Sequence, residues 1–211
     1  MADTYDLVVI GTGTAANVVL SQVAKARWRA AVIDNRPFGG TCALRGCDPK
    51  KMMVSAEEAL AAWRNMRGKG IDGELGIDWP DLMRFKRTFT DPIPQKRERH
   101  FAQLGVTTFH GTAGFTDVDA IDVAGRELKF RHALIATGAR PIPLGIRGED
   151  LLITSDDFLE LEELPRRILF VGGGYIAAEF SQLAARAGSS VTVLQRGRRL
   201  LEGFDPDLVK L

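Results

Sequence analysis

The chain has few residues that commonly bind metals in proteins. Its 211 residues include two cysteines and three histidines. A structural zinc site needs four ligands held close together. Here the cysteines precede His100, His110 and His132, which are scattered far downstream. The sequence therefore predicts no metal site.

The chain also lacks an excess of charge of either sign and a long apolar run. Lys plus Arg (28) nearly balance Asp plus Glu (27), giving a formal net charge of +1 at pH 7. Nucleic-acid binders carry a basic face, and a membrane-spanning helix needs about 20 apolar residues. Residues 1–6 are acidic and do not resemble a signal peptide. We therefore expect a cytoplasmic protein that binds neither nucleic acid nor membranes.

Both cysteines lie in one short stretch. Cys42 and Cys47 are five positions apart, beside Gly39 and Gly40 and ahead of a predicted helix. Such a pair can close a small disulfide if the chain brings the two Cα atoms within about 4.4 to 6.8 Å. In a reducing compartment, close cysteines are more often catalytic or metal-binding than structural. The pair therefore indicates a redox function.

A strand, a glycine turn and a helix near the N-terminus predict a dinucleotide site. The β-branched run 5–10 ends at the sequence GTGTAA of residues 11–16, and an apolar segment follows over residues 17–28. This order is typical of the first turn of a dinucleotide-binding fold.

Each part of this turn has an expected role. Gly11 permits the tight turn, Gly13 lets a pyrophosphate approach the backbone, and small Ala16 lets the helix pack on the strand. The second strand, residues 30–33, ends in Asp34, which can accept hydrogen bonds from an adenosine ribose. The alternative is an ordinary strand-to-helix turn with a surface aspartate.

A second glycine turn follows the strand 167–171. Its nucleotide contacts are expected from Gly172, Gly174 and Ala177. Two such turns indicate two nucleotide cofactors.

The strand 191–194 of this second unit ends in Gln195 and Arg196, where the first unit has an acid. An acid favours a free ribose hydroxyl and an arginine favours a 2′-phosphate, so we predict NADP(H) rather than NAD(H). The alternative is a solvated basic turn over residues 196–199.

Helices and an antiparallel meander are predicted between the turns. Residues 52–66 and 79–104 have helical patterns, and Pro92 and Pro94 interrupt the second. The basic residues here are most simply a solvated face, namely Lys86, Arg87, Lys96, Arg97 and Arg99. Short alternating segments predict the meander, namely 106–109, 113–115, 120–123 and 127–130. A buried strand over residues 131–136 then leads to a proline-rich exit.

Together these motifs resemble the pyridine nucleotide-disulfide oxidoreductases, the family of glutathione reductase, dihydrolipoamide dehydrogenase and mercuric reductase. The resemblance rests on the first turn, residues 39–51, Ala136-Thr137-Gly138 and residues 171–179. It implies an α/β fold of FAD/NAD(P)-binding Rossmann-like domains, with a parallel sheet and an antiparallel β-meander. Residues 1–142 would form the FAD domain and residues 143–211 the start of a truncated NAD(P)H domain.

The resemblance also implies individual roles. Cys47 resembles the thiol beside the flavin, and Cys42 resembles the interchange thiol that attacks the substrate. Lys50 or Lys51 resembles the partner of Glu179 in an ion pair near the flavin. Further FAD contacts are implied for Thr41, Thr137 and Gly138, and Tyr175 resembles the residue that covers the nicotinamide pocket.

Some residues depart from the family pattern, which has Asn at the position of Arg45 and an aliphatic residue at that of Asp48. A carboxylate directly after Cys47 opposes thiolate formation. We expect Asp48 to act instead as the N-cap of the next helix, with Pro49 in its first turn. A helix N-terminus and a nearby lysine then lower the thiol pKa values.

The chain ends at Leu211, before the remainder of the second domain and the dimerisation domain that the resemblance implies. We therefore expect a fragment of a homodimeric enzyme, inactive or incomplete alone. The parent would be an NADPH-dependent, FAD-containing reductase of a small-molecule disulfide or thiol. The alternative is a non-catalytic nucleotide-binding module in which Cys42 and Cys47 sense redox state.

Overall fold

A computed structural model describes residues 3–210, and the chain divides into two compact units. The first unit comprises Met1–Pro49 and Thr88–Leu152, and the second comprises Lys50–Arg87 and Ile153–Leu211. The two nucleotide-binding domains expected over residues 1–142 and 143–211 are bounded by sequence motifs, whereas the two compact units are bounded by internal contacts. The domain boundaries stay a prediction.

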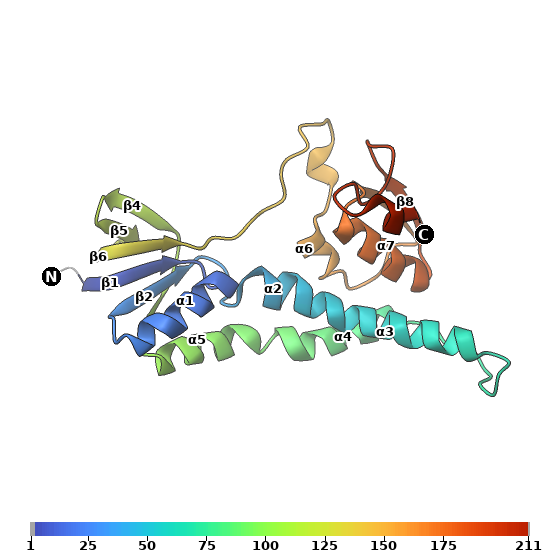
Figure 1. The fold of residues 1–211 in the computed structure, drawn as a ribbon, viewed down its shortest axis with the longest axis horizontal. Helices are drawn as coiled ribbons and strands as arrows, with labels where there is room; N and C mark the ends of the chain where they lie inside the picture. The colour runs from blue at the N-terminus through green and yellow to red at the C-terminus, as the bar shows by residue number, and fades with distance from the viewer. Residues whose placement is uncertain (1–2, 211) are drawn as a thin grey trace. The chain divides into compact units, whose positions relative to one another are not determined.

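The first unit is built on a six-stranded sheet with the order β3-β2-β1-β6-β5-β4 (Figure 1). Strands β3, β2, β1 and β6 are parallel, and β6, β5 and β4 form an antiparallel meander. The elements are β1 (Asp3–Ile10), α1 (Thr14–Lys25), β2 (Ala30–Asp34), α2 (Gly40–Arg45), α5 (Ile93–Gln103), β3 (Thr107–His110), β4 (Ala113–Asp117), β5 (Ala120–Val123), β6 (Arg126–Ile135) and η1 (Glu149–Leu151).

Apolar side chains cover both faces of this sheet because successive strand residues point to opposite sides. Leu7 and Val9 of β1 pack in one cluster with Leu20 of α1 and Phe101 of α5. Val8 belongs to the cluster on the other face, which includes residues of β5 and β6. The predicted α/β fold with a mainly parallel sheet and a meander is confirmed.

Two strand predictions are wrong in detail. β3 pairs in parallel with β2, so it belongs to the parallel part of the sheet and the meander starts at β4. Residues 126–135 form one strand, β6, which extends beyond its pairing with β5. Its C-terminal half is therefore mostly exposed and is not the predicted buried strand.

The second unit combines helices with a two-stranded parallel sheet of β7 and β8. Its core includes the aromatic rings of Trp79, Phe158 and Phe180 together with Met53 and Leu183. It contains most of α3 (Cys47–Met66) and α4 (Trp79–Thr90), and all of α6 (Ser155–Phe158), β7 (Arg167–Val171), α7 (Tyr175–Arg186), β8 (Ser190–Leu194) and α8 (Pro206–Lys210).

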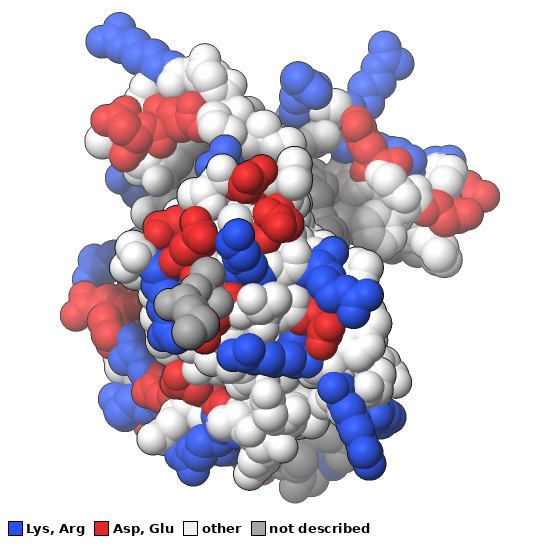
Figure 2. Space-filling view, turned by 90° about the vertical axis from the view of Figure 1, so that its left-hand side faces the viewer, with Lys and Arg blue, Asp and Glu red and all other residues white. Residues whose placement is uncertain are grey.

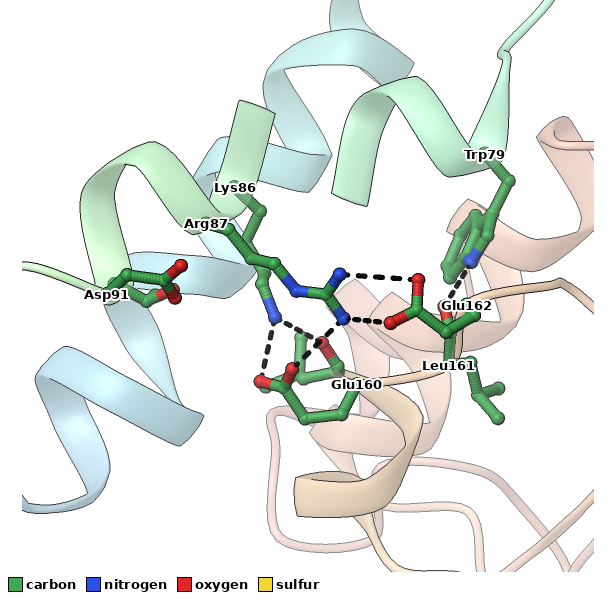
Figure 3. Close-up of polar contacts among 9 residues, drawn as sticks. Trp79, Lys86, Arg87, Asp91, Glu160, Leu161 and Glu162 are labelled. Atoms are coloured by element: carbon green, nitrogen blue, oxygen red, sulfur yellow. Dashed lines mark hydrogen bonds and ion pairs between the residues drawn. The ribbon is translucent and has the colours of Figure 1, made fainter. Parts of the chain in front are cut away.

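Lys86 is fully buried in this unit, which contradicts the predicted solvated basic face. Its Nζ donates to the carbonyl oxygen of Leu159 at 2.5 Å and to Oε1 of Glu160 at 2.7 Å (Figure 3). The neighbouring Arg87 donates to both carboxylate oxygens of Glu162. A buried ammonium needs such partners. Helical periodicity alone does not reveal these partners, because they come from a segment more than 70 residues downstream.

Basic and acidic side chains are interspersed over the face shown in Figure 2. This distribution agrees with the near balance of the two charges in the sequence. Within residues 3–210, no helix is both long and apolar enough to cross a membrane.

Candidate redox and nucleotide sites

The first glycine turn lies between β1 and α1 and is closely packed. Gly11 has a φ of +105°, and a Cβ added to it would lie 2.3 Å from the carbonyl oxygen of Ala136. Only glycine fits this conformation and this space. Gly13 precedes α1 without a side-chain cap, and Ala16 is fully buried. The first N–H groups of α1 can therefore bind the oxygens of a phosphate group.

Asp34 organises this turn from the end of β2. Its Oδ2 accepts hydrogen bonds from the backbone N of Thr12 at 3.0 Å and from Thr12 Oγ1 at 2.6 Å. Its Oδ1 accepts from the backbone N of Arg36, and Thr12 Oγ1 accepts from the backbone N of Gly39. A carboxylate has about four acceptor positions, so one can still accept from a ribose hydroxyl. Sequence reasoning missed Thr12 because a small polar residue inside a glycine turn carries no periodic signal.

The cysteine-bearing helix α2 packs directly on this turn. Gly40, its first residue, has a φ of +71°, and an added Cβ would lie 2.4 Å from the Cα of Gly13. On the other side, a Cβ added to Gly39 would lie 2.8 Å from Cγ2 of Ile93 on α5. Helix α2 is therefore held between the start of α1 and the start of α5.

Three further predicted FAD contacts lie in the same unit. Thr41 is exposed in the first turn of α2. Thr137 and Gly138 follow β6 and are exposed, and the backbone N of Thr137 would lie 3.3 Å from a Cβ on Gly11. The first unit thus brings together the glycine turn, Asp34 and these three residues. This glycine-lined turn with unused backbone donors and a carboxylate fits a dinucleotide.

The two cysteines lie together at the junction of α2 and α3. Cys42 is half-buried, Cys47 is exposed, and both are free thiols in the structure. Burial raises the pKa of the Cys42 thiol, and the side-chain hydrogen bond with Cys47 raises it further. The negative charges of Cys47 and Asp48 act in the same direction. A hydrogen bond with the Cys47 backbone opposes these effects only in part, so the expected lowered pKa is wrong for Cys42.

Asp48 does not have the predicted N-cap position. Helix α3 begins at Cys47, so Asp48 lies inside its first turn with an exposed side chain. An acid in the first turn is favourable for the helix dipole. Its charge nevertheless acts on the Cys42 thiol.

Within the second unit, Lys50 rather than Lys51 pairs with Glu179. The distance from Lys50 Nζ to Glu179 Oε1 is 2.5 Å, and both side chains are partly exposed. Lys51 is exposed. A second ion pair, Glu57 with Arg186 at 2.8 Å, joins the same helices, α3 and α7. The structure therefore selects one of the two lysines that the sequence left open.

The second glycine turn repeats the hydrogen bond of the first with a neutral acceptor. The backbone N of Gly173 donates to Gln195 Oε1 at 2.8 Å, and the two residues are 22 positions apart, as in the first turn. Gly172 has a φ of +104°. Helix α7 follows Gly174 without a side-chain cap. This turn can therefore also present backbone donors to a phosphate group.

The other predicted residues of the second site lie around this turn. Tyr175 begins α7 and is 58% exposed, and Ala177 is half-buried. Arg196 follows β8 and is exposed. Nearby Arg199 donates to the carbonyl oxygens of Glu202 and Phe204, so it shapes its own loop.

The sequence profile described as pyridine nucleotide-disulphide oxidoreductase matches residues 5–211. The chain belongs to this family. Its members are flavin-dependent oxidoreductases, so the resemblance predicted from the motifs is confirmed.

Individual relatives agree with this assignment. The chain is 35% identical over 209 residues to glutathione reductase of Burkholderia cepacia, covering 97% of this chain and 46% of the relative. It is 33% identical over 210 residues to mercuric reductase of Staphylococcus aureus, covering 97% of this chain and 38% of the relative. It is 32% identical over 215 residues to dihydrolipoyl dehydrogenase of Mycoplasma pneumoniae, covering 98% of this chain and 47% of the relative. The chain thus spans less than half the length of these relatives.

A solved structure of the family is also similar. It is a Cu(II) complex of a Cys-to-Ser mutant of the HOCl-induced flavoprotein disulfide reductase RclA from Escherichia coli. The TM-score is 0.83 at 28% sequence identity, and the match covers 97% of this chain and 45% of that chain.

The contact between α2 and the first turn can be tested at two glycines of similar conformation. Gly40 and Gly138 have φ values of +71° and +74°, but only Gly40 faces a backbone atom at 2.4 Å. We expect Gly138→Ala to cost about 1–2 kcal/mol through left-handed strain. Gly40→Ala should cost about 1–3 kcal/mol more because the added Cβ overpacks the contact. Urea unfolding, monitored by hydrogen exchange in β1 and β2, measures the loss of unfolding free energy in each variant. Equal losses in the two variants would contradict the close contact.

The effect of Asp48 on Cys42 can be tested through alkylation. Because the Asp48 charge raises the pKa of the Cys42 thiol, Asp48→Asn should lower that pKa. In a Cys47→Ser background, Cys42 should then react faster with iodoacetamide at pH values below its pKa. The rates should converge at high pH, where both proteins carry the thiolate. Exposed Glu58 on α3 provides the control Glu58→Gln, and an unchanged or slower reaction of the Asp48 variant would refute the effect.

Proposed function

We propose that this chain forms part of an NADPH-dependent flavoprotein reductase in which Cys42 and Cys47 pass electrons to a small-molecule disulfide. The carrying observation is the contact between Cys47, the first residue of α3, and Cys42 on α2, the helix that packs on a dinucleotide-type turn. Family membership supports the same redox function. We expect the complete reductase to be a homodimer.

The two thiols have separate roles in the proposed exchange. The Cys42 thiolate attacks a substrate disulfide, which forms a mixed disulfide and releases one thiol. Cys47 then attacks the Cys42 sulfur, closes the Cys42–Cys47 disulfide and releases the second thiol. The cysteine pair loses two electrons and two protons, and the substrate disulfide gains both.

The first site supplies the groups that would hold FAD. The N-terminus of α1, with Gly11 and Gly13, would bind the pyrophosphate, and Asp34 would accept from the ribose. Ala16 allows the close packing of α1, and further contacts are proposed for Thr41, Thr137 and Gly138. FAD, when bound, supplies the two-electron transfer from NADPH to the disulfide.

The second site would hold NADPH in the same manner, through Gly172, Gly174 and Ala177. Arg196 would bind the 2′-phosphate, and Tyr175 would cover the nicotinamide pocket. Gln195 supports NADPH rather than NADH because its neutral amide accepts the hydrogen bond from the turn without placing a negative charge beside the 2′-phosphate. The role of the Lys50–Glu179 pair beside the flavin stays a prediction.

Electron transfer to the cysteine pair is the central test. In the complete reductase, we expect NADPH and FAD together, but neither alone, to reduce the oxidised pair under anaerobic conditions. Thiol titration should show two new thiols per chain, whereas Cys42→Ser and Cys47→Ser should gain none. Flavin reduction without new thiols would contradict the proposed route. A reversible disulfide that responds to a glutathione buffer but not to NADPH and FAD would favour the redox-sensing module.

The choice of NADP can be tested with two nucleotides that differ by one phosphate. We expect Arg196→Ala to weaken binding of adenosine 2′,5′-bisphosphate by about tenfold, the size of one charge-assisted contact. Binding of 5′-AMP should change little. Exposed Arg167 provides the control Arg167→Ala, because it lies at the opposite end of the β7–β8 sheet. Calorimetric titration measures the affinities of both nucleotides for the unsubstituted protein and the two variants, and an equal loss for both nucleotides in Arg196→Ala would refute 2′-phosphate recognition.

A further inference from the structure

Lys86 of α4 is a fully buried cation that has no part in either proposed nucleotide site. Its Nζ donates to the carbonyl oxygen of Leu159 and to a carboxylate oxygen of Glu160 (Figure 3). Leu159 is fully buried, whereas the Glu160 side chain is about half exposed. Apolar side chains often replace buried ion pairs without loss of stability, so stability alone does not account for a buried lysine. What Lys86 fixes is the position of a buried backbone carbonyl directly after α6.

The segment 159–162, which follows α6, lies along one face of α4. Trp79 precedes Lys86 by seven residues on α4, and its Nε1 donates to the carbonyl oxygen of Leu161 at 2.8 Å. Residues seven apart lie on the same face of a helix, two turns from each other. Arg87 adds an ion pair to the last residue of the segment. The segment is therefore held on α4 at both of its ends.

The residue directly before this segment, Phe158, contacts the elements that carry the second glycine turn. Its ring stacks on the Phe180 ring of α7 with 4.5 Å between the centroids. The same ring lies 5.9 Å from the Phe170 ring of β7. Strand β7 ends directly before Gly172, and α7 begins directly after Gly174. A displaced Phe158 ring would therefore change the packing of both elements that flank the turn.

We propose that Lys86 is a positioning residue for the second nucleotide turn. Its ammonium anchors the Leu159 carbonyl, and this anchor holds the neighbouring Phe158 ring against β7 and α7. The turn then keeps the geometry in which its backbone donors can face a phosphate group. This inference rests on the proposed function, because it requires that the second turn binds a nucleotide. It adds to that site a residue that does not touch the nucleotide.

The test follows nucleotide binding separately at each glycine turn by nuclear magnetic resonance of the isotope-labelled chain. The amide signal of Gly173 reports the second turn and that of Thr12 reports the first, because each N–H donates to a side chain 22 residues downstream. The probe is adenosine 2′,5′-bisphosphate. Its titration gives an apparent affinity at Gly173 for each variant.

We expect Lys86→Met to weaken binding at Gly173 by about fivefold, because apparent affinity falls with the fraction of molecules that hold the binding geometry. Met retains the apolar stem but leaves the Leu159 carbonyl without its donor. Arg87→Met is the matched control. It removes a partly exposed cation from the next position and should change the affinity by less than about twofold. The response of Thr12 to the probe should be the same in all three proteins.

A double-mutant cycle tests whether Lys86 acts through Phe158. Phe158→Leu alone should weaken binding at Gly173 by about fivefold. If the two residues act through one contact, the double variant should also lose about fivefold, whereas independent effects would multiply to about twenty-fivefold.

A milder variant covers the case in which Lys86→Met does not fold. Glu160→Gln removes the negative charge that faces Lys86 but keeps an oxygen acceptor at a half-exposed position. It should weaken binding at Gly173 by about twofold. Circular dichroism establishes which variants are folded before the titrations.

The outcomes separate this inference from the proposed function. If Gly173 responds to the probe but folded Lys86→Met, or Glu160→Gln in its place, leaves the affinity unchanged, the inference is wrong. An equal loss in Arg87→Met, or a multiplied loss in the double variant, also contradicts it. If Gly173 does not respond to the probe in the unsubstituted chain, the proposed NADP site is wrong and the inference falls with it.

Discussion

The backbone contact between Gly13 and Gly40 determines where the cysteine helix can lie. A Cβ on Gly40 would lie 2.4 Å from the Cα of Gly13, so α2 can approach the turn only because Gly40 has no side chain. A Cβ on Gly13 would lie 3.8 Å from the Cα of Gly40, which is an ordinary contact distance. Gly13 is also the residue that precedes α1, whose free N–H groups suit a pyrophosphate. Cys42 follows Gly40 by two residues. The proposed nucleotide site and the position of Cys42 therefore depend on one contact.

The two glycine turns share a hydrogen bond but differ in the charge of its acceptor. In both, a backbone N–H binds a side chain 22 residues downstream, at the end of the next strand. Asp34 carries a negative charge, whereas Gln195 forms the equivalent bond as a neutral amide. The shared bond keeps the same turn geometry, with φ values of +105° at Gly11 and +104° at Gly172. The change of acceptor alters the electrostatic potential at the ribose end, which is where the cofactors proposed for the two turns, FAD and NADPH, differ in charge.

The parts that were predictable from sequence are those set by local patterns. Glycine spacing and apolar runs locate both turns and their flanking strands, because close backbone approach and strand burial each leave a direct mark on the residue types. The partners of an element leave no such mark. Alternation identifies β3 as a strand, but its neighbour β2 could not be inferred from it. Lys50 and Lys51 point about 100° apart on a helix, and only tertiary structure shows which one meets Glu179.

The raised pKa of Cys42 affects how the site can select a substrate. A higher thiol pKa lowers the thiolate fraction at neutral pH, but the thiolate that forms is the stronger nucleophile, so part of the loss in rate is offset. Asp48 contributes to this shift, and the same negative charge repels an anionic disulfide that approaches Cys42.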